Sequence, residues 1–86
     1  MMRAKLQVGF VQEGFSWGEP KEKTSETLTM HGVCAKEYPP DGSDDDNTYA
    51  KFSPQADFRI TIMNSALWGK FRVGDKFYAD FTPAPN

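Results

Sequence analysis

The stretch ADFRITIM, residues 56–63, decides the fold class. Apolar side chains at positions 58, 60 and 62 alternate with polar ones at 57, 59 and 61. This period of two is that of a β-strand with one buried face. Branched and aromatic side chains are also typical of strands. The stretch therefore predicts a strand with a well-defined register, in which Phe58, Ile60 and Ile62 contact the core.

Four further segments are also predicted as strands. Three of them alternate in the same way, namely residues 4–12, 26–36 and 77–81, and a shorter one, residues 48–52, is ended by a Ser-Pro pair. The positions expected to face the core are Leu6, Val8 and Phe10 in the first segment, Leu28, Met30 and Cys34 in the second, and Phe77, Ala79 and Phe81 in the third. Since the chain has seven Phe and aromatic rings bury large areas, we expect a Phe-rich core.

Only residues 64–71 could be helical, because Asn64 or Ser65 could cap one or two turns that Gly69 would end. The connections between the five strands are too short for parallel crossovers, so the sheet should be antiparallel. A flat sheet would leave one face bare. The predicted fold class is therefore all-β with one short helical turn: a small antiparallel five-stranded barrel or a compact sandwich.

A chain of 86 residues makes at most one domain, and residues 1–86 are expected to form a single β domain. Surface loops are expected near residues 13–24 and 37–47, followed by an extended tail at residues 82–86. The first loop contains glycines, a proline and several charges. The second contains Pro-Pro-Asp-Gly, whose fixed φ angles and missing N–H donors exclude regular structure.

Composition excludes several classes of protein. With 38% hydrophobic residues, 14% aromatic residues and a net charge of -2, the chain resembles neither a disordered acidic tail nor a basic nucleic-acid arm. Cys34 is the only cysteine, so an intrachain disulfide is excluded and a reducing cytoplasm is favoured. No apolar run approaches the length of a membrane span or has the pattern of a signal peptide. No membrane association is expected.

No pattern of catalytic or metal-binding residues is present. The single histidine, His31, lies three residues before Cys34, a spacing that puts the two side chains on opposite faces of a strand. Phosphate-binding loops and nucleophile elbows are absent. We therefore expect no enzyme, no catalytic residue and no cofactor.

The acidic segment resembles the start of a calcium loop, because Asp41, Ser43 and Asp45 place oxygen atoms at alternate positions. However, Asp46 stands where such a loop needs glycine, and Phe52 where it needs a bidentate glutamate. No metal site is therefore expected.

Residues 37–47 contain five acidic residues and no base, whereas the rest of the chain has seven acidic and ten basic residues. Concentrated charge steers a basic partner and sets its register, so this segment is a candidate docking surface for a protein. The alternative is a solvated connection, and in both cases neutralising residues 44–46 should leave folding almost intact. The candidate partner-binding residues are Tyr38, Asp41, Asp44, Asp45, Asp46 and Tyr49, with Trp17 and Trp68, which are predicted to lie in loops.

An alternative function is single-stranded nucleic-acid binding by a small β-barrel, which combines aromatic rings with basic residues. The candidates for this face, at the end of the chain, are Arg59, Trp68, Lys70, Arg72, Lys76 and Tyr78. The negative net charge and the acidic segment oppose phosphate binding. Nucleic acid is therefore the less favoured partner.

Several motifs resemble small uncharacterised all-β proteins encoded by tailed bacteriophages and prophages. They are DGSDDDNTYAKFSP at residues 41–54, a Phe-x-Ile-x-Ile strand, Asn-Ser-Ala-Leu-x-Gly-Lys-Phe, and GDKFYADFTP at residues 74–83. The likeness covers about residues 47–83, together with Met-Arg-Ala-Lys near the start. It implies no activity, and it transfers no functional residue.

The resemblance does imply a setting, which is the host cytoplasm or the virion. Two protein-binding roles fit that setting: an accessory inhibitor of a host factor, and a virion or assembly component. The partner would be a host or phage protein. The sequence does not decide between these roles and does not predict the oligomeric state.

Overall fold

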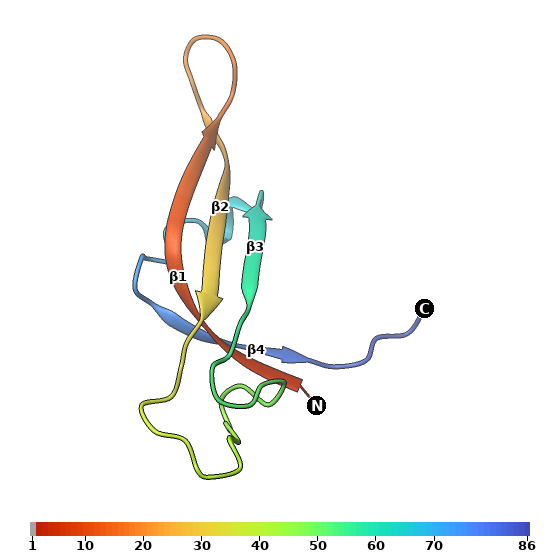
Figure 1. Cartoon of the computed structure of the whole chain (residues 1–86). Helices are drawn as coiled ribbons and strands as arrows, with labels where there is room; N and C mark the ends of the chain where they lie inside the picture. Colours follow the sequence, from red (N-terminus) through yellow and green to blue (C-terminus); the bar gives the residue numbers. More distant parts are fainter. Residues whose placement is uncertain (1) are drawn as a thin grey trace.

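The computed structural model describes residues 2–86, which form a single open antiparallel sheet with the strand order β3-β2-β1-β4 (Figure 1). The strands are β1 (Met2–Phe15), β2 (Lys23–Gly32), β3 (Asp57–Ile62) and β4 (Lys76–Phe81), and η1 (Ser65–Leu67) is a single 3-10 turn. The predictions of an all-β fold and of antiparallel pairing are confirmed. The prediction of five strands in a closed barrel or sandwich is wrong, because there are four strands in one open sheet.

The strand predicted at residues 48–52 is absent, and this accounts for the missing fifth strand. These residues lie in turns within the long connection between β2 and β3. Ala50 N–H donates to the carbonyl of Asn47 at 3.0 Å, and Phe52 has a φ of 58°. Both observations are incompatible with an extended strand. Periodicity over so few residues could not distinguish the two conformations.

β1 contains a β-bulge at Gly9, where the register with β2 shifts between Val8 and Phe10. A bulge inserts one extra residue and bends the strand. Side chains beyond it therefore point to the opposite face from the one that simple alternation predicts. Leu6 and Val8 are therefore buried as predicted, whereas Phe10 is 56% exposed. The prediction that Phe10 faces the core is wrong for this reason.

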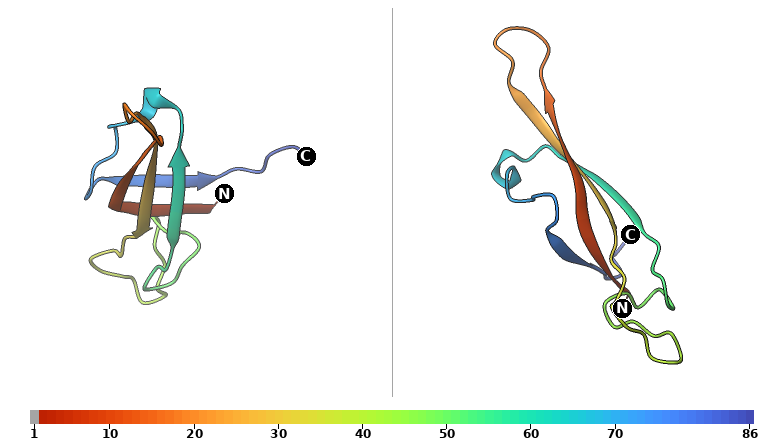
Figure 2. Two further views of the ribbon diagram at one scale, coloured as in Figure 1. Left: turned by 90° about the horizontal axis from the view of Figure 1, so that it is seen from above. Right: turned by 60° about the vertical axis from the view of Figure 1, so that its left-hand side comes forward.

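The sheet is strongly coiled, so that its two edge strands approach each other. β4 pairs with the first residues of β1, from Met2↔Phe81 to Gln7↔Lys76, and β2 pairs with β1 from Leu6 onward. Figure 2 shows that β4 and the start of β1 run across the direction of β2 and β3. The inner faces of β3 and β4 therefore look toward each other although the two strands are not paired.

The core is small and aliphatic. Its buried residues are Ala4, Leu6, Val8, Leu28, Met30 and Ile62. None of the seven Phe is buried among residues 2–86; Phe58 and Phe71 only pack against the core. The prediction of a Phe-rich core is wrong, because an open single sheet provides no second layer to cover the rings. Ile60, predicted to be core, is 42% exposed on edge strand β3.

Two surface loops and an extended tail were the segments predicted to lie outside the sheet. β1 and β2 extend into the predicted loop 13–24, so that only residues 16–22 form the tip of a long hairpin. The acidic segment 37–47 lies in an irregular connection that spans residues 33–56, and the tail 82–86 extends away from the sheet (Figure 1). Cys34, predicted to be buried, follows the end of β2 and is exposed.

The predicted helical turn is present as η1, whose N-cap, Asn64, accepts a hydrogen bond from Ala66 N–H. No residue of η1 is buried, so η1 itself does not close an end of the sheet. Trp68 and Phe71, which follow it, pack against the core instead.

The molecule exposes more surface than a compact domain of its size. Its radius of gyration is 16.3 Å, against about 12 Å for a compact chain of this length. The accessible surface is 6601 Å², against about 5100 Å² for a compact monomer of this mass. The long hairpin, the tail and the open sheet account for this excess.

Leu28 and Ile60 face each other across β2 and β3 and provide a matched pair of truncations. Leu28 is 1% exposed and Ile60 is 42% exposed. Leu28→Ala should lower the free energy of unfolding by about 2–5 kcal/mol, and Ile60→Ala by only about 1 kcal/mol, because less apolar area leaves water at that site. Urea denaturation of both variants measures the difference. Equal losses would contradict the open edge at β3.

Candidate functional site

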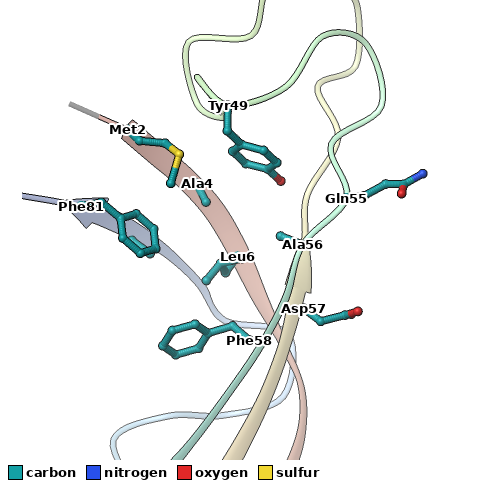
Figure 3. A pocket seen from close by; sticks show the side chains of 10 residues that line it. Met2, Ala4, Leu6, Tyr49, Gln55, Ala56, Asp57, Phe58 and Phe81 are labelled. Carbon is teal, nitrogen blue, oxygen red and sulfur yellow. The ribbon is translucent and has the colours of Figure 1, made fainter.

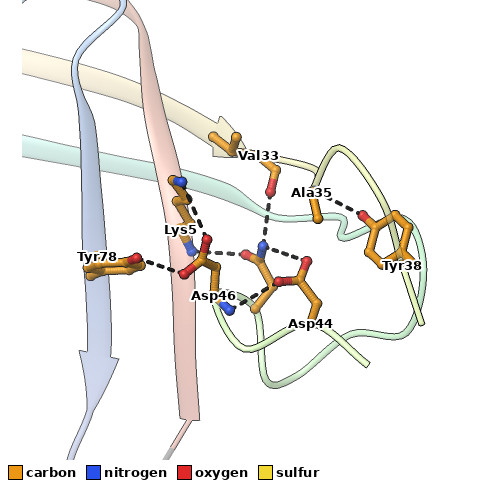
Figure 4. Close-up of polar contacts among 8 residues, drawn as sticks. Lys5, Val33, Ala35, Tyr38, Asp44, Asp46 and Tyr78 are labelled. Carbon is orange, nitrogen blue, oxygen red and sulfur yellow. Dashed lines mark hydrogen bonds and ion pairs between the residues drawn. The ribbon is translucent and has the colours of Figure 1, made fainter. Parts of the chain in front are cut away.

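The acidic segment is held against the start of β1 by the side chain of Asn47. This residue is 0% exposed. Its Oδ1 accepts a hydrogen bond from Lys5 N–H at 2.9 Å, and its Nδ2 donates to the Val33 carbonyl at 2.9 Å and to Asp44 Oδ2 at 3.1 Å (Figure 4). A buried amide needs all these partners, since an unsatisfied polar group is costly. Asn47 therefore fixes the segment relative to the sheet.

Asp44 and Asp46, two of the predicted docking residues, are hydrogen-bonded within this anchored segment. Asp44 is 9% exposed, and its Oδ1 accepts from Asp46 N–H at 3.0 Å. Asp46 accepts a hydrogen bond from the Tyr78 hydroxyl at 2.7 Å and forms an ion pair with Lys5 Nζ at 3.3 Å. The Tyr78 hydroxyl first, and then Lys5, hold the pKa of Asp46 below its ordinary value of 3.8. Both carboxylates thus bind the protein's own groups.

Three other predicted residues of the segment are placed differently. Tyr38 is half-buried, packs its ring at 5.9 Å from that of Phe52, and accepts from Ala35 N–H at 3.2 Å. Asp41 is exposed but accepts from Ser43 N–H at 3.0 Å, which lowers its pKa. Within residues 2–86, Asp45 is exposed and makes no hydrogen bond or ion pair through its carboxylate. It alone among the three central aspartates is free to meet a partner.

The two tryptophans do not join this segment. Trp17 is 100% exposed in the hairpin tip, which lies at the end of the molecule opposite the acidic segment (Figure 1). Trp68 is half-buried, donates from Nε1 to the Ile62 carbonyl at 2.9 Å, and has Lys23 Nζ at 5.1 Å from its ring centroid. The predicted set of site residues is therefore divided among separate places.

These contacts change the expected effect of the acidic residues on folding. Asp44 uses both carboxylate oxygens, for Asp46 N–H and Asn47 Nδ2, and Asp46 uses both of its own, for Tyr78 and Lys5. Asparagine offers only one such oxygen, so the structure gives a reason to expect lower stability where the sequence predicted almost none. Charge density alone does not reveal this, since Lys5 and Tyr78 are far from Asp46 in the sequence.

A second candidate site is an apolar cavity of about 210 Å³ on the inner face of the sheet, which we call the apolar groove. It is lined by residues of β1, β3, β4 and the long connection, namely Met2, Ala4, Leu6, Tyr49, Gln55, Ala56, Asp57, Phe58, Ala79 and Phe81. Figure 3 shows Phe58 and Phe81 on its two sides, while Gln55 and Asp57 point away from it. Its surface is therefore almost wholly apolar.

Tyr49, one of the predicted docking residues, points its ring into the groove (Figure 3). Its hydroxyl oxygen is enclosed and has no hydrogen-bond partner among residues 2–86. Burial raises the pKa of this phenol, so it is a neutral donor near neutral pH.

The groove is bordered by two unpaired strand edges. β3 pairs only with β2, and β4 pairs only with β1, within the described part of the chain. Unpaired edges offer backbone N–H and C=O groups to another strand. The alternation of apolar and polar residues placed Phe58 and Phe81 in the core. It does not reveal that the two strands carrying these rings are left as unpaired edges.

The basic and aromatic residues of the alternative nucleic-acid surface are partly engaged within the fold. Arg3 lies 4.4 Å from the centroid of the Tyr78 ring, and Tyr78 donates to Asp46. Trp68 is held by its indole hydrogen bond. A base that stacked on the face of Tyr78 covered by Arg3 would have to displace that guanidinium.

Neither a membrane-spanning helix nor a metal cluster is found in the described chain. Among residues 2–86, no helix has the length and apolarity needed to cross a membrane. Nor do three or more His, Cys, Asp or Glu side chains come together there in a way that could hold a metal ion.

Comparison of the chain with protein-family models, curated proteins and solved structures found no match. The resemblance to phage-encoded proteins stays a prediction from the sequence.

Asn47→Asp tests the anchoring of the acidic segment at constant side-chain size. Aspartate cannot donate to the Val33 carbonyl and brings a second carboxylate against Asp44. The free energy of unfolding should fall by roughly 2–4 kcal/mol. The matched control, Asp45→Asn, should change it by less than about 0.5 kcal/mol. Both values come from urea denaturation, and an unaffected Asn47→Asp variant would show that the segment is not anchored.

Acid should destabilise the fold partly through Asp46. Because the folded-state pKa of Asp46 lies below its ordinary value of 3.8, its contribution is complete above that value. The contribution is lost as the pH falls through the lowered folded-state pKa. Between about pH 5 and about pH 2, the free energy of unfolding should therefore decrease less in Asp46→Asn than in the native protein. Identical slopes in Asp46→Asn and the native protein would refute the role of Asp46.

Proposed function

We propose that the protein is a non-enzymatic protein-binding module that takes an extended segment of a partner protein along its apolar groove. The observation that carries this proposal is an apolar cavity between two strand edges that face each other without being paired. A strand inserted there would bond to an edge and cover the rings that the open sheet leaves exposed.

The side chains around the groove support this mode of binding. Phe81 is 51% exposed and Met2 is 43% exposed, and both line the groove. Contiguous exposed apolar surface is a mark of interaction sites. In strand addition, backbone hydrogen bonds give affinity, and pockets for alternate side chains give specificity. The groove and the adjoining edges offer both.

The side chains of the groove suggest what the partner supplies. The lining of the groove is almost wholly apolar, and the Tyr49 hydroxyl is enclosed by the protein itself. Apolar side chains at alternate positions of that segment would contact Phe58 and Phe81. A short, alternating and mostly apolar segment is the proposed ligand class.

In this proposal the acidic segment has a secondary role. Asp45 and Asp41 are exposed and can steer a basic partner, whereas Asp44 and Asp46 shape the fold. The host or phage partner, and the roles of accessory inhibitor or assembly component, follow from the sequence resemblance. The groove serves either role, because both require protein binding without chemistry.

Phe81→Ser and Phe15→Ser form a matched test, because these rings are 51% and 52% exposed and lie at opposite ends of β1 and its partners. A displayed library of random peptides yields binders, whose affinities are then measured by calorimetry. Phe81→Ser should weaken binding about ten-fold or more, since a Phe side chain would no longer be buried on binding. Phe15→Ser should leave the affinity unchanged. Binders that are insensitive to Phe81→Ser would overturn the groove as the binding site.

A further inference from the structure

The free edge of β4 has a defined set of hydrogen-bonding residues. On β1, Arg3 and Lys5 donate their N–H groups to Thr48 and Asn47, away from β4. The backbone groups of Ala4 and Leu6, which alternate with these two residues, therefore face β4. Val8 N–H faces the same side and donates to the Asp75 carbonyl. With the register Ala4↔Ala79, the residues that turn their backbone groups to the open edge are Lys76, Tyr78 and Asp80.

These three residues are self-complementary. In an antiparallel pairing about Tyr78, Lys76 of one copy stands opposite Asp80 of a second copy, and this happens twice across the two-fold axis. The backbone groups of all three residues then find partners. We propose that β4 pairs with β4 of a second copy of this chain in this register, which joins two sheets into one.

The side chains of β4 on the inner face of the sheet are also compatible with this register. Phe77 of one copy lies opposite Ala79 of the other, so each large side chain meets a small one. Phe77 is 36% exposed and Ala79 is partly buried. Pro83, which has no N–H to donate, lies beyond the paired residues and does not interrupt them.

The charged side chains on the outer face of the sheet are compatible with this register as well. Asp80 is held by Arg3 through Nε–Oδ1 at 2.7 Å and a second bond at 3.1 Å. Its side chain is 37% exposed, so an ammonium group from a second copy can approach it from the open side. Arg3, Asp80 and the second copy's Lys76 then form a row of alternating charge.

The other free edge lacks this complementarity. Gly32 N–H donates to the Ala56 carbonyl, which puts the outward-turned backbone groups of β3 at Asp57, Arg59 and Thr61. Pairing of β3 with itself about its central outward residue would set Arg59 against Arg59. Like charges directly opposite destabilise a strand pair. β4 is therefore the edge for a second copy, and β3 stays free beside the groove.

Two charge variants test both the dimer and its register. Sedimentation equilibrium of the native protein should give about twice the monomer mass of 9.7 kDa. Lys76→Glu sets two acidic pairs across the interface, and Asp80→Lys sets two basic pairs. Each variant alone should dissociate at least about ten-fold more readily, because both pairs change from attraction to repulsion. An equimolar mixture should form a heterodimer, in which every pair is opposite in charge again.

The controls separate this proposal from misfolding and from the function proposed above. Circular dichroism of each variant checks its fold, and recovery of the dimer on mixing excludes a general loss of structure. Arg59→Glu makes the same type of charge reversal on β3 and should leave the dimer intact. A native protein that sediments as a monomer at the concentrations used for NMR would overturn the proposal. So would a dimer insensitive to Lys76→Glu, or two variants that stay apart on mixing. Lys76→Glu and Asp80→Lys test this pairing, whereas Phe81→Ser tests the groove, so the two proposals fail in separate experiments.

Discussion

The carboxamide of Asn47 takes the place of a strand beside the first residues of β1. β2 pairs with β1 only from Leu6 onward, so the backbone of Lys5 would otherwise face solvent on that side. Asn47 accepts its N–H and ties it to Val33 at the end of β2. Because one side chain and a few neighbouring residues satisfy this edge, the connection needs no regular structure. The position of the acidic segment and the bonds of Asp44 follow from this contact.

The same arrangement keeps the sheet open. With the connection bonded to β1 and the segment after η1 crossing to β4, neither of these two stretches bridges β3 and β4. The coil of the sheet, which begins at the Gly9 bulge, turns these two edges toward each other but does not join them. The aromatic rings on their inner faces therefore stay partly exposed. A small aliphatic core and a large accessible surface are two results of one unclosed sheet.

Much of this fold could be predicted from alternation alone. The period of two located β3 and β4 almost to the residue and identified Leu28 and Met30 as core. It failed beyond Gly9, where the bulge shifts the alternation of buried and exposed residues by one position. It also failed at residues 48–52, where a short segment that was predicted to be a strand forms turns. The site was less accessible to sequence reasoning, because Asp46 meets Lys5 and Tyr78 across distant parts of the chain. The groove depends on which edges are left unpaired, and no local pattern encodes that.

β1 is synthesised before β2 and β3, and β4, which pairs with β1, is synthesised after them. The β1–β2 hairpin is local and can form early, since short loops close at little entropic cost. Contacts such as that between Arg3 and Asp80 join residues 77 positions apart, and such long-range pairing is slow to form. During synthesis the β1–β2 hairpin thus carries an unpaired edge on β1 until β4 has been made. The order of synthesis leaves that edge open to other strands for as long as the intervening residues take to be added.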